Sequence, residues 1–343
     1  MRYRLLEGFV AMLLGVAMLA SPAWSTSDPL QTQALRYFKS LIPANMPRQP
    51  RVLVSLGRQL YYDPRLSISG AISCSTCHSL SSYGVDNLST SLGHKAQPGD
   101  RNAPTVLNAV LNFRQFWDGR AANLVEQAKG PILNPVEMGM PNPQLAIERI
   151  RTVPGYQAPF RSAFPRSPEP TYDHIAVAIA AFESTLLTPS RFDRFLEGDA
   201  AALSAPERKG LRLFMDQGCA SCHDGVGIGG NSFKKFGLFK PYSDRRDLGR
   251  YVITKQAKDK FVFKVPSLRN VTRTYPYFHD GRVWQLSKAV QIMGETQLGK
   301  RLSNSDTTAI VAFLGSLDGD LSSSILRLPV LPPSGPHTPK PER

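Results

Sequence analysis

Four stretches of the chain place hydrophobic residues at the spacing of an amphipathic helix: 53–62, 174–187, 207–216 and 306–317. In the second stretch, the residues on one helical face are Ile175, Ile179, Phe182 and Leu186. Sustained alternation of polar and apolar residues, which would indicate strands, is scarce. The pattern therefore predicts a mostly α-helical protein.

The second half of the chain repeats the first. The block 102–124 aligns without gaps with the block 264–286, and both contain the pattern Phe-x-Asp-Gly-Arg. The helical stretches 53–62 and 207–216 also share a Gly-x-x-Leu-aromatic pattern. Because 343 residues with 42% hydrophobic content can bury two compact cores, the repeat predicts a tandem duplication of one domain.

The N-terminus has the layout of a secretory signal peptide. Two arginines precede an apolar run from Phe9 to Ala20, and the small residues Ala23 and Ser25 form a cleavage pattern. The alternative is a retained anchor, but the run is shorter than the roughly 20 residues that span a bilayer. We expect residues 1–25 to be removed and the mature protein to be soluble in the periplasm.

All four cysteines lie in two motifs, CSTCH at 74–78 and CASCH at 219–223. In an exported protein, two Cys-x-x-Cys pairs could form redox disulfides or a four-thiolate zinc site. The histidine after each pair favours covalent c-type haem, in which two thiols bind the vinyl groups and the histidine binds the iron. We therefore predict two covalent haems. The residues that hold them are Cys74, Cys77, His78, Cys219, Cys222 and His223.

Function depends on the sixth ligand of each iron, because a haem with two protein ligands passes electrons whereas an open haem can bind a substrate. His94 lies in a glycine-rich loop just past the first motif, with better access to that haem than the other free histidines. Met293 follows the repeat block, where the chain can return over the second haem, although methionine at helical spacing is usually a core residue. Methionine ligation would raise that haem's potential and make it an electron acceptor.

These features predict two tandem cytochrome c-like domains. The N-terminal domain covers 26–188 with the first haem, and the C-terminal domain covers 189–327 with the second. The proline-rich composition of 328–343 predicts a disordered tail.

Several motifs resemble those of the bacterial di-haem cytochrome c peroxidases, a family related to the maturation enzyme MauG. The resemblance covers nearly the whole mature chain. Its motifs are DPRLSISGAISCSTCH from 63, GH at 93, RNAPT at 101, FWDGRA at 116, EQAKGP at 126, VEM at 136, PYFH at 276 and AVQIMGETQLG from 289.

This resemblance implies roles for single residues. His94 matches a displaceable distal ligand of the first, low-potential haem, and Met293 matches the axial ligand of the second, high-potential haem. Glu137 matches the acid-base group of the peroxide site, and Gln127 matches a pocket residue beside it. Trp117 matches an aromatic residue between the haems. Without the match, a glutamate is more often a surface residue and a tryptophan a core residue.

The resemblance also implies a calcium ion between the domains, with Asn102 and the carbonyls of Thr274 and Pro276 as ligands. One amide and two backbone oxygens are a weak signal by themselves, since calcium takes 6 to 8 oxygen ligands. Water molecules would have to complete the shell.

The chain is basic, with 41 lysine and arginine residues against 27 acidic residues and a formal net charge of +14. This charge could steer an acidic electron donor, such as a small c-type cytochrome or a cupredoxin, or it could serve solubility or contact with anionic membrane. The sequence has no face on which basic and aromatic residues alternate, so we do not expect it to bind nucleic acid. The resemblance further implies a homodimer.

Two classes of function follow from these features. The first is an enzyme that reduces hydrogen peroxide to water with electrons that enter at the second haem. The second is a di-haem electron carrier in which His94 never leaves the iron. A related alternative is MauG-like oxidation of a protein partner; MauG-type proteins have tyrosine in place of Met293, so the methionine favours the peroxidase.

Overall fold

The structure is a computed structural model that describes residues 28–342. Its helices are α1 (Pro29–Ala34), α2 (Arg51–Tyr62), α3 (Cys74–Cys77), α4 (Leu124–Leu133), α5 (Pro143–Arg151), α6 (Pro154–Ala163), α7 (Tyr172–Glu183), α8 (Arg191–Leu196), α9 (Ala205–Asp216), α10 (Tyr251–Thr254), α11 (Leu286–Leu298), α12 (Asn304–Gly315) and α13 (Ser323–Leu326). Two short antiparallel strands are β1 (Phe233–Lys235) and β2 (Val262–Lys264). Single 3₁₀ turns are Pro43–Asn45, Pro64–Leu66, Leu80–Ser82, His94–Ala96, Ala109–Leu111, Ala200–Ala202, Cys219–Ser221 and Ala257–Asp259. The prediction of a mostly helical protein is confirmed.

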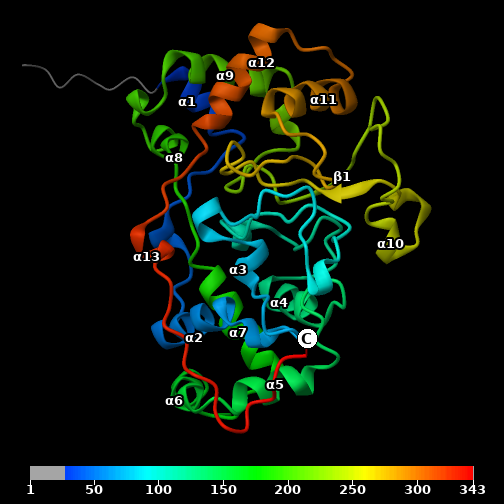
Figure 1. Cartoon of the computed structure of the whole chain (residues 1–343). Helices are drawn as coiled ribbons and strands as arrows, with labels where there is room; N and C mark the ends of the chain where they lie inside the picture. Colours follow the sequence, from blue (N-terminus) through cyan, green and yellow to red (C-terminus); the bar gives the residue numbers. More distant parts are fainter. Residues whose placement is uncertain (1–27, 343) are drawn as a thin grey trace, which may run out of the picture.

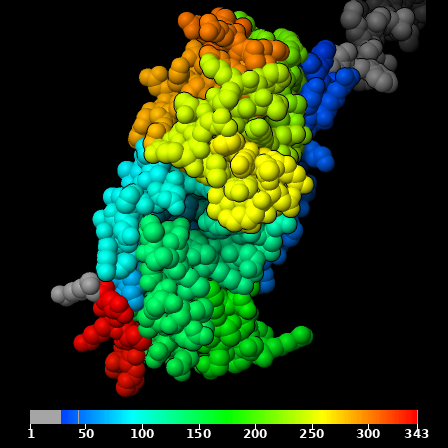
Figure 2. Space-filling model, turned by 90° about the vertical axis from the view of Figure 1, so that its right-hand side faces the viewer, coloured from blue at the N-terminus to red at the C-terminus, as the bar shows by residue number. Residues whose placement is uncertain are grey.

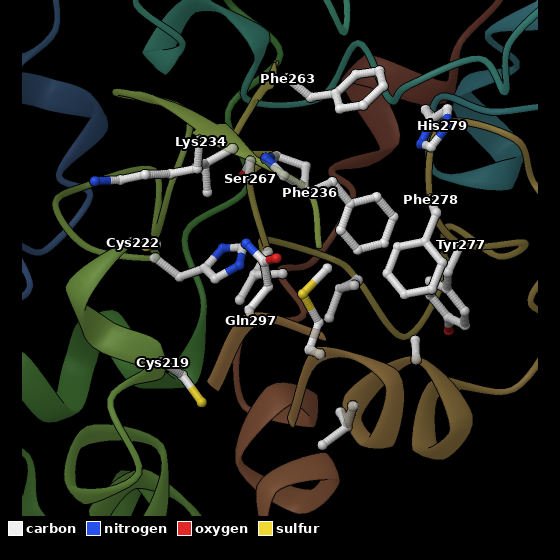
Figure 3. Close-up of a pocket in the computed structure, with 18 of the residues that line it drawn as sticks. Cys219, Cys222, Lys234, Phe236, Phe263, Ser267, Tyr277, Phe278, His279 and Gln297 are labelled. Carbon is white, nitrogen blue, oxygen red and sulfur yellow. The ribbon is translucent and has the colours of Figure 1, made fainter. Parts of the chain in front are cut away.

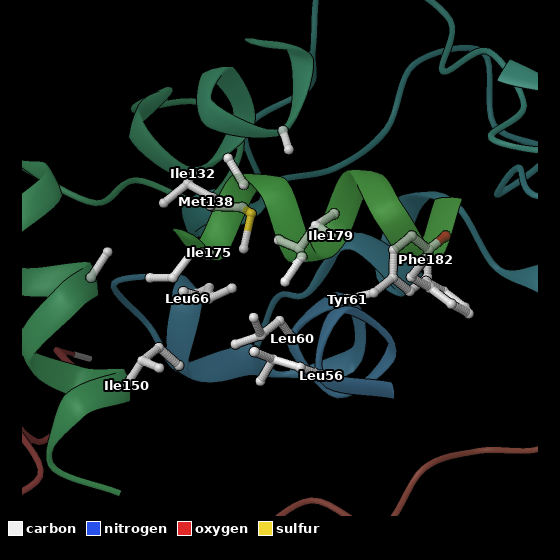
Figure 4. Close-up of a cluster of buried hydrophobic side chains, with 14 of the residues drawn as sticks. Leu56, Leu60, Tyr61, Leu66, Ile132, Met138, Ile150, Ile175, Ile179 and Phe182 are labelled. Atoms are coloured by element: carbon white, nitrogen blue, oxygen red, sulfur yellow. The ribbon is translucent and has the colours of Figure 1, made fainter. Parts of the chain in front are cut away.

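Two helices cross at the centre of the N-terminal domain, as Figure 4 shows. The apolar faces of α2 and α7 pack together through Leu56, Leu60, Ile175, Ile179 and Phe182. Gly57 of α2 lies so close to the carbonyl oxygen of Ala178 that a Cβ atom would not fit. The glycine of the Gly-x-x-Leu-aromatic pattern thus allows the two backbones to approach.

The C-terminal domain repeats this crossing with α9 and α12. Gly210 of α9 lies against the carbonyl oxygen of Ala309, again with no room for a Cβ atom. Outside the helices, Asn108 and Asn270 occupy equivalent places in the repeat blocks, and both have left-handed backbones with φ of 59° and 61°. The backbone therefore has the duplication that the sequence repeat predicts.

Thr188 joins the two halves. Its hydroxyl oxygen accepts hydrogen bonds from the side-chain amides of Asn108, at 2.7 Å, and Asn270, at 2.8 Å. All three residues are buried, so each hydrogen bond satisfies groups that water does not reach. The repeated asparagines thereby fix one threonine of the connection between the domains.

The N-terminal segment 29–41 differs from the sequence-based domain boundary. Leu30, Ala34 and Phe38 lie in the core of the C-terminal domain with α8, α9 and α12. The carboxylate of Asp193 also accepts a hydrogen bond from the Leu41 backbone at 2.7 Å. This segment precedes the first haem domain in sequence but packs with the second, since that core offers it an apolar surface.

The C-terminal tail was predicted to be disordered, but the structure places it along the N-terminal domain (Figure 1, Figure 2). It runs from α13, past α2 and α6, to the end of the chain beside α5. The Gln59 amide donates to the Val330 carbonyl at 3.1 Å, and the Arg149 guanidinium donates to the Lys340 carbonyl at 3.0 Å. Gly155 leaves space for Pro332 to pack. The prolines restrict the unfolded tail, which lowers the entropy cost of fixing it.

Within residues 28–342, no helix has the length and apolar character required to cross a membrane. The predicted signal peptide, 1–25, lies outside the described residues.

Candidate haem and peroxide site

The first cysteine motif forms a short helix and its end. Ser73 caps α3, and Thr76 completes the capping box, so Cys74 and Cys77 occupy one helical turn. The Tyr61 hydroxyl donates to the carbonyl of His78 at 2.5 Å, while the His78 Nδ1 lies 3.3 Å from the carbonyl oxygen of Gly84. These contacts fix the imidazole next to the two thiols.

The second motif borders a large cavity, shown in Figure 3. The cavity has a volume of about 510 Å³, and its lining includes Cys219, Cys222 and His223 of the motif and Met293 of α11. Burial lowers the pKa of His223 to about 4, with partial opposition from nearby backbone carbonyls. The imidazole is therefore neutral at physiological pH, the form that binds a metal.

These surroundings fit covalent haem. The four cysteines form no disulfides, and the cavity beside the second motif is bounded mainly by apolar side chains and by the sulfur-containing Met293. Within residues 28–342, no three His, Cys, Asp or Glu side chains gather as a metal cluster. The two Cys-x-x-Cys pairs therefore do not combine into a four-thiolate zinc site.

His94 is held against the turn that carries Glu137. Its backbone N–H donates to the carbonyl oxygens of Val136, at 2.9 Å, and Glu137, at 2.8 Å. Gly139 lies close to the imidazole ring. The Nδ1 atom is buried without a hydrogen-bond partner among the described residues. The ring is therefore positioned by its backbone and by packing rather than by its own polar atoms.

Glu137 is half-buried beside His94. Its Oε1 accepts a hydrogen bond from the Asn134 side-chain amide at 2.8 Å. Burial raises the pKa of Glu137, and the Arg120 guanidinium and the Asn134 hydrogen bond oppose that rise. Gln127 is half-buried on α4, the helix that leads into this turn. The carboxyl group can therefore exchange protons more readily near neutral pH than an exposed glutamate.

Trp117 lies at the boundary between the domains. Its indole N–H donates to the Asn102 carbonyl at 2.9 Å, and its ring contacts the ring of His279 edge to face, with centroids 6.3 Å apart. His279 in turn stacks on Phe263 at 4.3 Å. An aromatic chain thus connects the first domain to the cavity of the second.

The three residues predicted to bind calcium line the same cavity as Trp117 and Met293. The backbone N–H of Asn102 donates to the His279 carbonyl at 2.8 Å, and its side-chain amide donates to the Leu88 carbonyl at 2.9 Å. This leaves the amide oxygen of Asn102 as an acceptor. Thr274 and Pro276 approach from the C-terminal domain.

A family model described as di-haem cytochrome c peroxidase matches residues 51–201, and a cytochrome c model matches residues 207–318. A cytochrome c551 peroxidase from Pseudomonas aeruginosa is 47% identical, over 92% of this chain and 93% of the relative. The chain belongs to the di-haem cytochrome c peroxidase family.

Other relatives agree with this membership. A cytochrome c551 peroxidase from Nitrosomonas europaea is 45% identical over 96% of each chain, and a MauG from Methylorubrum extorquens is 36% identical over 81% of each. The crystal structure of a MauG-like protein associated with microbial copper homeostasis has a TM-score of 0.74 at 27% identity, covering 85% of this chain and 96% of that one.

Membership confirms the sequence-based assignment: two cytochrome c-type domains, two c-type haems and an oxidoreductase of the cytochrome c peroxidase type. Sequence reasoning gave no role to His279, which contacts Trp117. The signal was present, because His279 occupies the position of Trp117 in the second repeat block. Lys264, the position equivalent to Asn102, was also overlooked.

Proposed function

We propose that this di-haem protein reduces hydrogen peroxide to water, with electrons from a small c-type cytochrome or a cupredoxin. The observation that supports the proposal most strongly is that the backbone of His94 is hydrogen-bonded to the turn that contains Glu137. His94, whose ring has no hydrogen bond of its own at Nδ1, is attached by its backbone to the segment that presents Glu137. A displaceable ligand and an acid-base group therefore lie side by side.

The residues of this chain have separate tasks in the reaction. His78 and His94 would hold the first haem, and His223 and Met293 would hold the second. The bound haems supply the redox chemistry, with peroxide reduced at the first iron and an electron stored at the second. Each peroxide takes up two electrons and two protons, and its O–O bond breaks to give two water molecules.

Glu137 would move the protons. Its carboxylate takes a proton from the oxygen of peroxide that approaches the iron and returns it to the departing oxygen, which then leaves as water rather than hydroxide. The raised pKa suits both steps, because the carboxyl group gives back the proton more easily than a strongly basic group and takes it more easily than an ordinary glutamate. Gln127 would line this pocket.

Trp117 and His279 would connect the two haem sites. The edge-to-face contact of their rings crosses the domain boundary, and the backbone N–H of Lys264 donates to the Trp117 carbonyl at 2.7 Å. Electrons that enter the second haem could pass along this contact to the first.

Electron entry is supported by the surface near the second motif. Leu238 and Phe239 are exposed, at 64% and 66%, and Lys234 and Lys235 lie next to them on β1. An apolar patch bordered by lysines suits a donor with an acidic rim, and association with it would slow as salt increases.

The interdomain cavity also supports a calcium site at Asn102, Thr274 and Pro276, with water completing the shell. Calorimetric titration of chelator-treated holoenzyme with calcium tests it. The Asn102→Ala variant should bind calcium at least tenfold more weakly, and calcium binding equal to that of the wild type would place the ion elsewhere.

The proposal also includes a periplasmic location and a homodimeric state.

The function is tested by visible and EPR spectra of the purified holoenzyme, first fully oxidised and then after addition of one electron. We expect one electron to turn the first haem high-spin and the protein then to consume added peroxide. If both haems stay six-coordinate and peroxide persists, the protein is an electron carrier. If peroxide oxidises a protein partner without a cytochrome donor, the MauG-like alternative holds, although Met293 argues against it.

A further inference from the structure

Lys264 is a buried cation at the wall of the interdomain cavity. Only 7% of the residue is exposed, yet it lines the cavity that contains the second cysteine motif. It ends β2, where Phe233 of β1 is its partner in the strand register. Its position is therefore fixed by the backbone on two sides, by β1 and by the Trp117 carbonyl.

No acidic side chain in the described part of the chain compensates the charge of Lys264. Desolvation lowers the pKa of Lys264 to about 8, and no neighbouring carboxylate opposes that effect. The other buried cations differ. Arg269 forms an ion pair with Asp193 at 2.7 Å, and Arg149 donates to backbone carbonyls, including that of Ile68 at 3.0 Å.

An ammonium group that is buried without a partner costs several kcal/mol, so such groups are usually paired. The cavity next to Lys264 is mostly apolar and cannot replace the lost hydration. An anionic group that enters the cavity with the cofactor would compensate this charge.

The chemistry of haem supplies that anion. The two propionate groups lie on the edge of the macrocycle opposite the vinyl groups, which the thiols of Cys219 and Cys222 would take. Figure 3 shows these cysteines on one side of the cavity and Phe263 and His279 on the other. Lys264, the next residue of β2, also lines this cavity. A propionate group of a haem bound at the second motif would therefore share the cavity with the Lys264 side chain.

We infer that Lys264 binds a propionate carboxylate of the second haem and so helps to set the reduction potential of that haem. The inference rests on haem attachment at the second motif and does not require that peroxide be turned over. A cation near the haem favours the reduced iron, because reduction removes one positive charge. The backbone N–H of Lys264 also donates a hydrogen bond to the Trp117 carbonyl. The same residue would therefore contact both the second haem and the residue whose ring meets His279 between the domains.

The test compares the midpoint potentials of both haems in holoenzyme variants, measured by spectroelectrochemistry without peroxide. Lys264→Met should lower the equilibrium constant for reduction of the second haem at least tenfold. For one electron, this is a decrease of about 59 mV in the reduction potential. Lys264→Arg keeps the charge and should remain near the wild type. Lys234→Met is the matched control, because this lysine lines the same cavity but is exposed.

An unchanged second potential in Lys264→Met would overturn the inference, as would equal shifts in Lys264→Met and Lys234→Met. A shift confined to the first haem would assign the lysine to the other cofactor and also overturn it. If Lys264→Met does not fold, Lys264→Gln gives the same comparison with a polar side chain of similar length. None of these outcomes depends on peroxidase activity, so the proposed function can fail while this inference stands.

Discussion

Replacement of Glu137 with glutamine should reduce peroxide turnover by about 10²- to 10⁴-fold, the usual contribution of a positioned acid-base group. Glutamine has nearly the same shape and can still accept the hydrogen bond from Asn134, but it cannot take or return a proton. Steady-state turnover with a reduced cytochrome donor measures the effect. Haem content and the spectrum of the oxidised protein should be unchanged, because Glu137 is not one of the proposed iron ligands.

The pH dependence of peroxide turnover is a second test of the role of Glu137. Burial raises the pKa of Glu137, so the wild-type rate should fall as pH decreases through a value above that of an ordinary glutamate. The Glu137→Gln variant should lack this acidic limb. Glu126→Gln is the matched control, since Glu126 is an exposed carboxylate on the adjacent helix α4. Wild-type turnover in Glu137→Gln would remove this residue from the mechanism.

Deletion of residues 328–343 should lower the free energy of unfolding of the N-terminal domain by at least about 3 kcal/mol, at about 1 kcal/mol for each of the three hydrogen bonds made by the tail backbone. These bonds join the carbonyls of Val330 and Lys340 to Gln59 and Arg149, and the backbone N–H of Glu342 to the Ile68 carbonyl. Denaturant unfolding followed by the absorbance of the first haem measures the change. Equal unfolding midpoints for the full and truncated chains would show that the tail adds no stability.

The deletion should also loosen the distal side of the first haem. The N–H of Ile68 donates to the Met138 carbonyl at 2.9 Å, and the neighbouring Glu137 carbonyl accepts the N–H of His94. Without the tail, the segment that holds His94 loses one of its supports. We expect a larger high-spin fraction of the first haem in the oxidised protein by EPR.

Lys340→Ala is the control for both measurements on the tail. Its side chain is exposed, and the bond to Arg149 uses the backbone carbonyl, which alanine retains. This variant should therefore behave as the wild type. A loss of stability in Lys340→Ala as large as that of the deletion would assign the effect to surface charge instead.

The sequence predicted the features that depend on local spacing. Helical periodicity predicted α2, α7, α9 and α12. Each of these helices buries one apolar face, and the spacing of the residues on that face can be read from the local sequence. The two Cys-x-x-Cys-His motifs predicted the haem sites for the same reason, since thiols and imidazole must lie within one turn. The resemblance to the peroxidase family could also be recognised from the sequence, because its motifs are contiguous, and the comparisons confirm it.

The composition of the tail predicted disorder, and this was wrong for a physical reason. A proline-rich segment cannot form its own core, so composition counts it as unstructured. The partners of the tail lie far away in sequence: Gln59 and Arg149 provide donors, and Gly155 provides space for Pro332. A segment that is ordered by another domain leaves no local signal.

By itself, the sequence determined that this protein has two c-type haems and a duplicated helical frame, and it predicted the histidines that would bind the two irons. Only the tertiary structure decided which groups meet between the domains. It packed segment 29–41 into the C-terminal core, brought His279 against Trp117, and buried Lys264 at the cavity wall with no carboxylate beside it among residues 28–342. Spacing along the chain records neighbours within a turn or two, whereas burial and charge compensation arise from contacts between distant residues, which only the folded chain creates.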